Sequence, residues 1–147
     1  MRSFASQSHV VWDCKYHVVI VPKYRKKKLY GDTRQRIGQI IRKLAEERHI
    51  VVLEGHAMPD HIHLVLSIPP RESVADVMGF LKGKSAIRAH FEFSKRKAPT
   101  QQKHFWSRGY FVSTVGIDEE MIRKYVRNQD DNDKRENNNP PLDLYWN

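Results

Sequence analysis

Residues 50–68 read IVVLEGHAMPDHIHLVLSI, and this stretch decides the fold. Two apolar runs rich in β-branched residues, 50–58 and 61–68, lie on either side of the turn-forming residues Pro59 and Asp60. The connection is much too short for the helical crossover that parallel strands require, so the two runs are predicted to pair as an antiparallel hairpin. The prolines at 69–70 then end the second strand.

The segments before the hairpin predict a strand and a helix. Residues 9–21 read HVVWDCKYHVVIV, which predicts a strand with Asp13, Lys15 and His17 on one face and the apolar side chains on the other. A helix is predicted over 33–48, where the apolar residues fall on one stripe: Ile37, Ile40, Ile41 and Leu44.

The segments after the hairpin predict a second helix, a fourth strand and a last helix. Ser73 is the expected N-cap of a helix that reaches about Phe91. The polar linker 94–103 follows, and 110–115 then predicts a strand. Asp118 is the expected cap of a short last helix. The expected apolar face of the second helix contains Val74, Val77, Phe80, Leu81 and Ile87.

This order of elements, β-α-β-β-α-β-α, predicts an α+β fold. Its first six elements match the ferredoxin-like, RRM-like βαββαβ pattern, an antiparallel sheet with helices on one face and a C-terminal helix added. That added helix carries Tyr125. We expect one catalytic domain over residues 1–129, and an irregular polar tail over 130–147, which contains the low-complexity run DDNDKRENNNPP.

Composition restricts the class of protein. The net charge of +9 indicates a polyanionic partner, since Lys and Arg that neutralise phosphates release condensed counterions. The single cysteine, Cys14, excludes an internal disulfide and a zinc site built on cysteines. The chain lacks an apolar run of about 18 residues, and its N-terminal residues lack a signal-peptide pattern, so a cytoplasmic location is predicted.

Basic residues gather in two clusters that also contain aromatic residues. The clusters lie at 22–28 and 82–97, a combination that suits a groove following a single-stranded backbone while bases stack on rings. A solvated face is the plain alternative for each cluster. The candidate DNA contacts are Lys23, Arg25, Lys26, Lys27, Lys28, Lys82, Lys84, Arg88 and Arg108.

His61 and His63 are candidate metal ligands. They are two residues apart on a strand, so their side chains leave the same face, roughly 6–7 Å apart, and can converge on one divalent ion. The face opposite holds the apolar residues of this strand, so the histidines point away from the core. The alternative is a pair of exposed polar residues. His17 can share their face as a rival ligand or serve as a structural hydrogen-bonding residue, and Asp60 can orient a ligand or only form the turn.

Tyr125 and Gln129 lie four residues apart and therefore on one face of the last helix. Taken separately, Tyr125 is equally consistent with a core aromatic residue, and Gln129 with a solvated surface residue. A phenol with an ordinary pKa of about 10 is a weak nucleophile at neutral pH, and a metal ion on the attacked phosphate would offset this weakness.

Together these patterns resemble the HUH single-tyrosine transposases of bacterial and archaeal insertion sequences. The resemblance covers nearly the whole ordered chain, through MPDHIHLVLSIP (58–69), FLKGKSA (80–86), FWSRGYFVSTVG (105–116) and YVRNQ (125–129). It implies that His61, His63 and Gln129 bind a divalent ion, Mg²⁺ or Mn²⁺. It also implies that Tyr125 attacks the scissile phosphate and forms a transient 5′-phosphotyrosine.

The resemblance further implies single-stranded DNA with hairpin ends as substrate and a homodimer as the working form. The sequence does not choose between placing the tyrosine helix on its own subunit or on the partner's. Three other functions stay open at this point. One is a domesticated relative that binds and nicks hairpins, and another is a non-catalytic RNA-binding module with an RRM-like sheet. The third is a metal-independent phosphodiesterase that uses the paired histidines, although it would leave Tyr125 and Gln129 unexplained.

Overall fold

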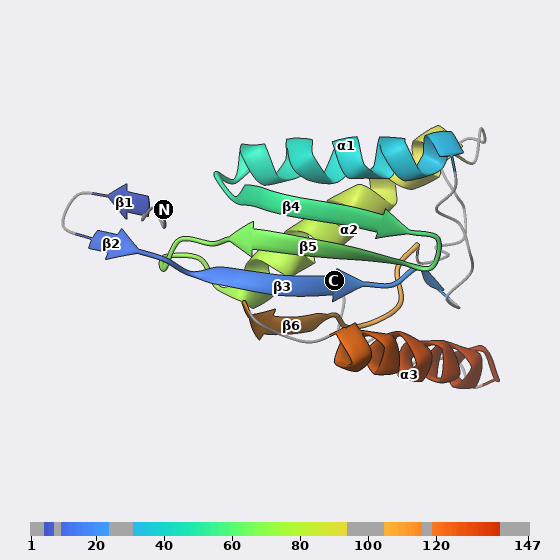
Figure 1. Cartoon of the computed structure of the whole chain (residues 1–147). Helices are drawn as coiled ribbons and strands as arrows, with labels where there is room; N and C mark the ends of the chain where they lie inside the picture. Colours follow the sequence, from blue (N-terminus) through green and yellow to red (C-terminus); the bar gives the residue numbers. More distant parts are fainter. Residues whose placement is uncertain (1–4, 8–9, 24–30, 94–104, 116–118, 139–147) are drawn as a thin grey trace.

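The computed structural model describes residues 5–7, 10–23, 31–93, 105–115 and 119–138 (Figure 1). Its centre is a four-stranded antiparallel sheet in the order β4-β5-β3-β6. The strands are β3 (Lys15–Ile20), β4 (Val51–Met58), β5 (His61–Ser67) and β6 (Phe111–Thr114). Helices α1 (Gly31–Glu47) and α2 (Val74–Phe93) pack together on one face of this sheet, so the α+β, ferredoxin-like prediction is confirmed.

The predicted hairpin is β4–β5, and β5 also pairs with β3 at the centre of the sheet. In the first pair His56 lies opposite His63, and in the second Val19 lies opposite the same histidine. Since partners in a ladder point to the same face, these registers fix which side chains of three strands share a surface.

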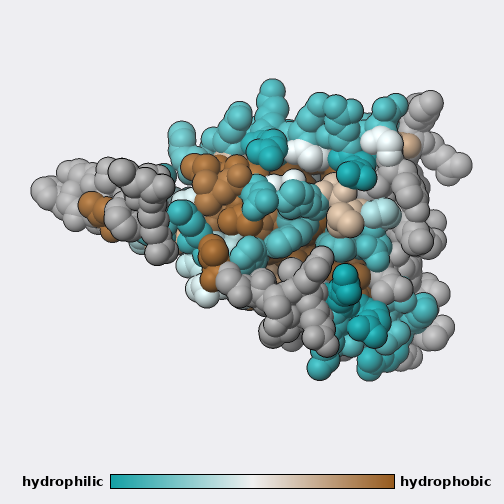
Figure 2. Space-filling view, in the orientation of Figure 1, coloured by the Kyte–Doolittle hydropathy of each residue, from teal (hydrophilic) through white to brown (hydrophobic). Residues whose placement is uncertain are grey.

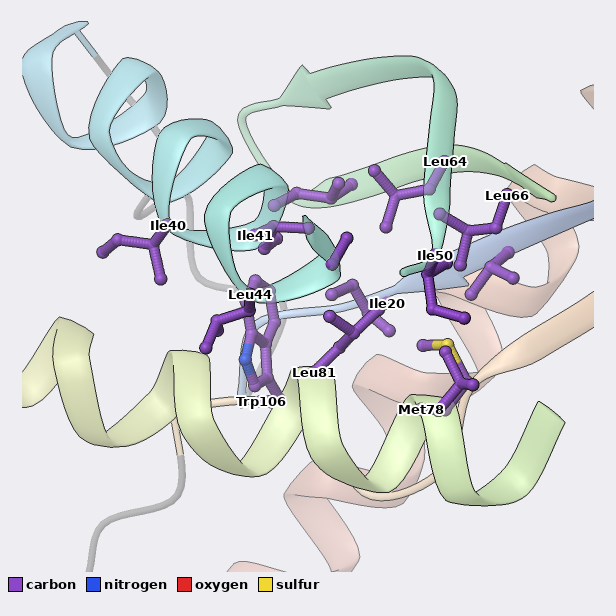
Figure 3. Close-up of a cluster of buried hydrophobic side chains, with 14 of the residues drawn as sticks. Ile20, Ile40, Ile41, Leu44, Ile50, Leu64, Leu66, Met78, Leu81 and Trp106 are labelled. Atoms are coloured by element: carbon purple, nitrogen blue, oxygen red, sulfur yellow. The ribbon is translucent and has the colours of Figure 1, made fainter. Parts of the chain in front are cut away.

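The core lies between the sheet and the two helices (Figure 3). Alternate residues of the central strands enter it, among them Val18 and Ile20 of β3 and Leu64 and Leu66 of β5, none more than 4% exposed. Each such side chain contributes about 1.5–3 kcal/mol when it leaves water. The helices supply Ile37, Ile40, Ile41 and Leu44 from α1 and Val77, Met78 and Leu81 from α2.

Helix α2 begins where the sequence predicts. The Ser73 side-chain oxygen accepts a hydrogen bond from the backbone amide of Asp76 at 3.0 Å, as an N-cap does. The prediction that Ile87 belongs to the apolar face is wrong, because its side chain is 52% exposed.

The predicted strand over 9–21 is two strands. Strand β2 (Val10–Trp12) pairs with β1 (Ala5–Gln7) in a separate two-stranded sheet, which extends from the main body in Figure 1. The division has a simple cause, since β3 pairs with β5 only as far as Lys15, opposite Ser67. One further backbone hydrogen bond joins Ile68 to Cys14, and before Cys14 the chain pairs locally with β1 instead.

Helix α3 (Glu119–Asn138) is much longer than predicted, and the expectation of an irregular tail is wrong for residues 130–138. Val126, Gln129 and Asp133 are buried at helical spacing, so the packed stripe continues into the polar run. Residues 139–147, like the predicted linker 94–103 and the cap at Asp118, lie outside the described residues.

The second face of the sheet is partly covered by α3. Val126 of α3 packs with Val19 and Val21, which follow the open side of β3, and Tyr125 and Phe111 border this cluster. The part of the chain that the structure describes contains no helix long and apolar enough to cross a membrane.

Candidate metal and tyrosine site

Four histidines lie on the face of the sheet opposite α1 and α2. His61 and His63 come from β5, His56 from β4 and His17 from β3, and the strand registers place all of them on one side. Figure 2 views this face, where hydrophilic side chains lie over the middle of the sheet. The alternation of the hairpin produces this surface, because Ile62 and Leu64 point into the core on the other side.

Asp60 orients His61. The Asp60 carboxylate lies 2.9 Å from Nδ1 of His61, so this ring nitrogen is engaged and Nε2 points away from the contact. A carboxylate on one nitrogen fixes the tautomer of an imidazole and strengthens the other nitrogen as a metal ligand. The turn between β4 and β5 therefore also fixes the orientation of the His61 ring through Asp60.

His63 is the centre of the histidine group. Its Nε2 lies 3.0 Å from Nδ1 of His17, and the two rings are 5.1 Å apart between centroids. Burial lowers the pKa of His63, and the neighbouring imidazoles of His17, His56 and His61 lower it further. A neutral imidazole keeps a lone pair for a metal ion, so this environment favours ligation.

The donor set fits a divalent ion. Two imidazoles with a third protein ligand leave positions for water or phosphate oxygens. Within the described ranges, no group of three or more His, Cys, Asp or Glu side chains converges to hold an ion. A third ligand of another type, such as the side-chain oxygen of Gln129, is compatible with that finding.

Tyr125 lies on α3 with its ring against Phe111, at 5.6 Å between centroids. Its hydroxyl lies 3.8 Å from the position that a Cβ would take at Gly109, a residue whose φ of 78° favours glycine. Burial raises the pKa of Tyr125, and the charge of Asp133 raises it further. The phenol is therefore neutral in this arrangement.

Gln129 is 7% exposed, one helical turn beyond Tyr125. The same helix contacts Val19 through Val126, and Val19 is the cross-strand neighbour of His63. The structure thus places Tyr125 and Gln129 on a helix that packs, within one chain, over the side of the sheet that carries the histidines.

Sequence reasoning missed a buried polar network that joins α2 to α3. Lys82 is 4% exposed, and its ammonium donates to the carbonyl of Ser107 at 2.8 Å and to that of Gly109. The hydroxyl of Ser107 donates to Asp133, which is fully buried. Burial lowers the pKa of Lys82 to about 7, an effect that the Asp133 charge opposes. The burial of Lys82 could have been predicted from its position next to Leu81, in the buried stripe of α2.

Lys82 was predicted to contact DNA, and that prediction is wrong because its side chain is inside the protein. Lys84, two residues later, is exposed, and Arg88 forms an ion pair with Glu47 at 3.2 Å. Lys23 and Arg108 are partly exposed. Arg25, Lys26, Lys27 and Lys28 lie outside the described residues.

Comparison with known proteins gives consistent matches along the chain. The family model described as "Transposase IS200 like" matches residues 10–129. The transposase for insertion sequence element IS200 of Salmonella typhimurium is 43% identical over 129 residues, 88% of this chain and 85% of that protein. The ISDra2 transposase TnpA of Deinococcus radiodurans is 31% identical over 122 residues, 82% of this chain and 87% of the relative.

Solved structures share the fold. A crystal structure of a candidate transposase from Deinococcus radiodurans has a TM-score of 0.74 at 27% identity, covering 85% of this chain and 97% of that one. A REP-associated tyrosine transposase bound to a REP hairpin has a TM-score of 0.53 at 13% identity, covering 77% and 62%. The second likeness concerns the fold alone.

Proposed function

Because the chain belongs to the IS200-like transposase family and is a transposase, we propose that it cuts and rejoins single-stranded DNA with Tyr125 as the nucleophile and a divalent ion, Mg²⁺ or Mn²⁺, beside it. One observation carries this proposal. Helix α3 brings Tyr125 and Gln129 to the side of the sheet that displays His61 and His63.

The reaction exchanges one phosphate ester for another. The Tyr125 oxygen attacks the scissile phosphorus and loses its proton, the bond from phosphorus to the 3′-oxygen breaks, and that oxygen takes up a proton. The products are a 5′-phosphotyrosine and a free 3′-hydroxyl, and attack by such a hydroxyl on the phosphotyrosine rejoins a strand without ATP. His61, His63 and Gln129 would hold the ion, which would supply charge neutralisation at the attacked phosphate.

Tyr125 must leave its present surroundings before it reacts. Its hydroxyl is packed against the 109–111 segment, and burial together with Asp133 keeps its proton in place. Substrate binding in this proposal shifts α3 enough to bring the phenol to the phosphate. The ring contact with Phe111 and the buried network around Asp133 are what such a shift would have to loosen.

A hairpin-bearing single strand is the proposed substrate, and a homodimer the proposed working form. The net charge of +9 favours a polyanion. A REP-associated tyrosine transposase with a similar fold was solved bound to a REP hairpin, which makes a hairpin the first substrate to test.

The test is a search for the covalent intermediate. The protein is incubated with labelled single-stranded hairpin DNA from its flanking region, with and without Mg²⁺ or Mn²⁺, and run on a denaturing protein gel. We expect a metal-dependent adduct that carries the DNA fragment on the 3′ side of the cut, joined to the protein through its 5′-phosphate. Tyr125→Phe should lose the adduct and keep hairpin binding, because only the attacking oxygen is removed. An adduct of equal yield from Tyr125→Phe would exclude this residue as the nucleophile.

A further inference from the structure

The face of α3 that carries Tyr125 also carries a buried carboxylate. Tyr125, Gln129 and Asp133 follow one another at four-residue steps, which places them along one side of the helix. Gln129 is buried and Asp133 is fully buried, although both side chains are polar. The side chain proposed as the nucleophile therefore lies two helical turns from a charged group that water does not reach.

The Asp133 carboxylate is held by Ser107, whose side chain is also buried. The Ser107 hydroxyl donates to this carboxylate, and the Ser107 backbone amide donates to the carbonyl of Val21 at 2.7 Å, directly after β3. A hydrogen bond to an ionised acceptor is roughly twice as strong as one between neutral groups. This contact therefore fastens the second half of α3 to the body of the protein.

The segment that holds Asp133 also lies against Tyr125. The Tyr125 hydroxyl is 3.8 Å from the position that a Cβ would take at Gly109, two residues after Ser107. The side-chain nitrogen of Lys82 donates to the carbonyls of Ser107 and Gly109, so α2 fixes the spacing between them. Because a helix moves as a stiff unit, Tyr125 stays beside Gly109 for as long as Asp133 stays on Ser107.

We propose that the hydrogen bond between Ser107 and Asp133 is a latch that keeps Tyr125 sheltered, and that the latch must open before DNA is cut. This inference rests on the proposed function, which makes Tyr125 the nucleophile. While the latch is closed, the phenol lies against Gly109 and Phe111. When it opens, α3 is free to carry the phenol to the scissile phosphate. The rate of attack then depends on the fraction of molecules in which the latch is open.

The test makes two measurements on each variant. Nitration of Tyr125 by tetranitromethane in the DNA-free protein, located by peptide mass spectrometry, reports how often the phenol is uncovered. The single-turnover rate of adduct formation, with Mn²⁺ and saturating labelled hairpin DNA from the flanking region, reports how often it attacks. Ser107→Ala removes the hydroxyl and keeps the backbone carbonyl that Lys82 binds. Both rates should rise about tenfold, because a hydrogen bond to a charged group is lost.

Two further variants accompany Ser107→Ala. Asp133→Asn keeps an acceptor for Ser107 but loses the charge, so both rates should rise by a smaller factor, and this variant decides the question if Ser107→Ala folds poorly. Asp131→Asn is the matched control, because Asp131 is exposed on the same helix. It should match the wild type in both measurements.

Unchanged nitration of Tyr125 in the latch variants would overturn the inference, since other contacts would then shelter the phenol. Faster nitration with an unchanged or slower rate of adduct formation would overturn it as well, because opening would not control the attack. If the wild type forms no adduct, the proposed function fails, and the nitration rates alone then decide whether the latch holds Tyr125.

Discussion

At the scale of single residues, the least expected side chain is Lys82. A lysine in a basic cluster is normally solvated, yet this one is almost fully buried between α2 and the segment that carries Ser107 and Gly109. Its side-chain nitrogen donates to two backbone carbonyls, those of Ser107 and Gly109, and so ties α2 to the segment that lies next to the Tyr125 hydroxyl.

Lys82 should make stability depend on pH. Burial lowers its pKa from 10.5 to about 7 in the folded protein, so between these values the unfolded chain binds the extra proton. Stability should therefore rise with pH across that window, by up to about 1.4 kcal/mol per pH unit. We expect the free energy of unfolding, measured in urea at pH 7, 8 and 9, to rise less with pH in Lys82→Met than in the wild type. If the free energy of unfolding rose equally with pH in the wild type and in Lys82→Met, the lowered pKa of Lys82 would be contradicted.

At the scale of elements, α3 shows how a helix can be fixed by polar groups. Its described buried side chains are Val126, Gln129 and Asp133, and only the first is apolar. A buried carboxylate such as Asp133 needs its hydrogen bond from Ser107, because an unsatisfied buried group costs about 1–3 kcal/mol.

Asp133→Ala should therefore loosen α3 selectively. We expect amide hydrogen exchange along residues 123–133 to become faster while exchange in β3 and β5 stays slow, because the apolar core does not involve Asp133. Asp131→Ala is the matched control, since Asp131 is exposed on the same helix. Equal exchange in Asp133→Ala and wild type would show that Val126 and Gln129 suffice to hold the helix.

The same helix marks the limit of what the sequence predicts. The hairpin and the histidine face followed from alternation in 50–68, because period-two patterns fix both the strands and their faces. The end of α3 did not follow, since residues 130–138 read as solvated by composition and only tertiary contacts bury Asp133. The contact between His17 and His63 also depends on strand register, which sequence reasoning could not give to the ångström.

At the scale of the whole molecule, the net charge of +9 should govern how strongly the protein binds DNA. Binding of hairpin DNA should weaken steeply with salt, because each neutralised phosphate releases counterions. The slope of log K against log salt reports how many phosphates the protein neutralises. Two lysines of the chain form a matched pair for measuring it. Lys84 and Lys82 are two residues apart on α2, one exposed and the other buried.

Lys84→Ala should reduce the slope of log K against log salt by roughly 1, because a solvated lysine in this cluster can reach a phosphate. Lys82→Met should leave the slope unchanged, even if it lowers stability, because a buried ammonium that donates to Ser107 and Gly109 releases no counterion from DNA. Fluorescence anisotropy of a labelled hairpin over a series of salt concentrations gives both slopes. A change with Lys82→Met and none with Lys84→Ala would mean that the buried network, rather than the surface of α2, sets the DNA-binding charge.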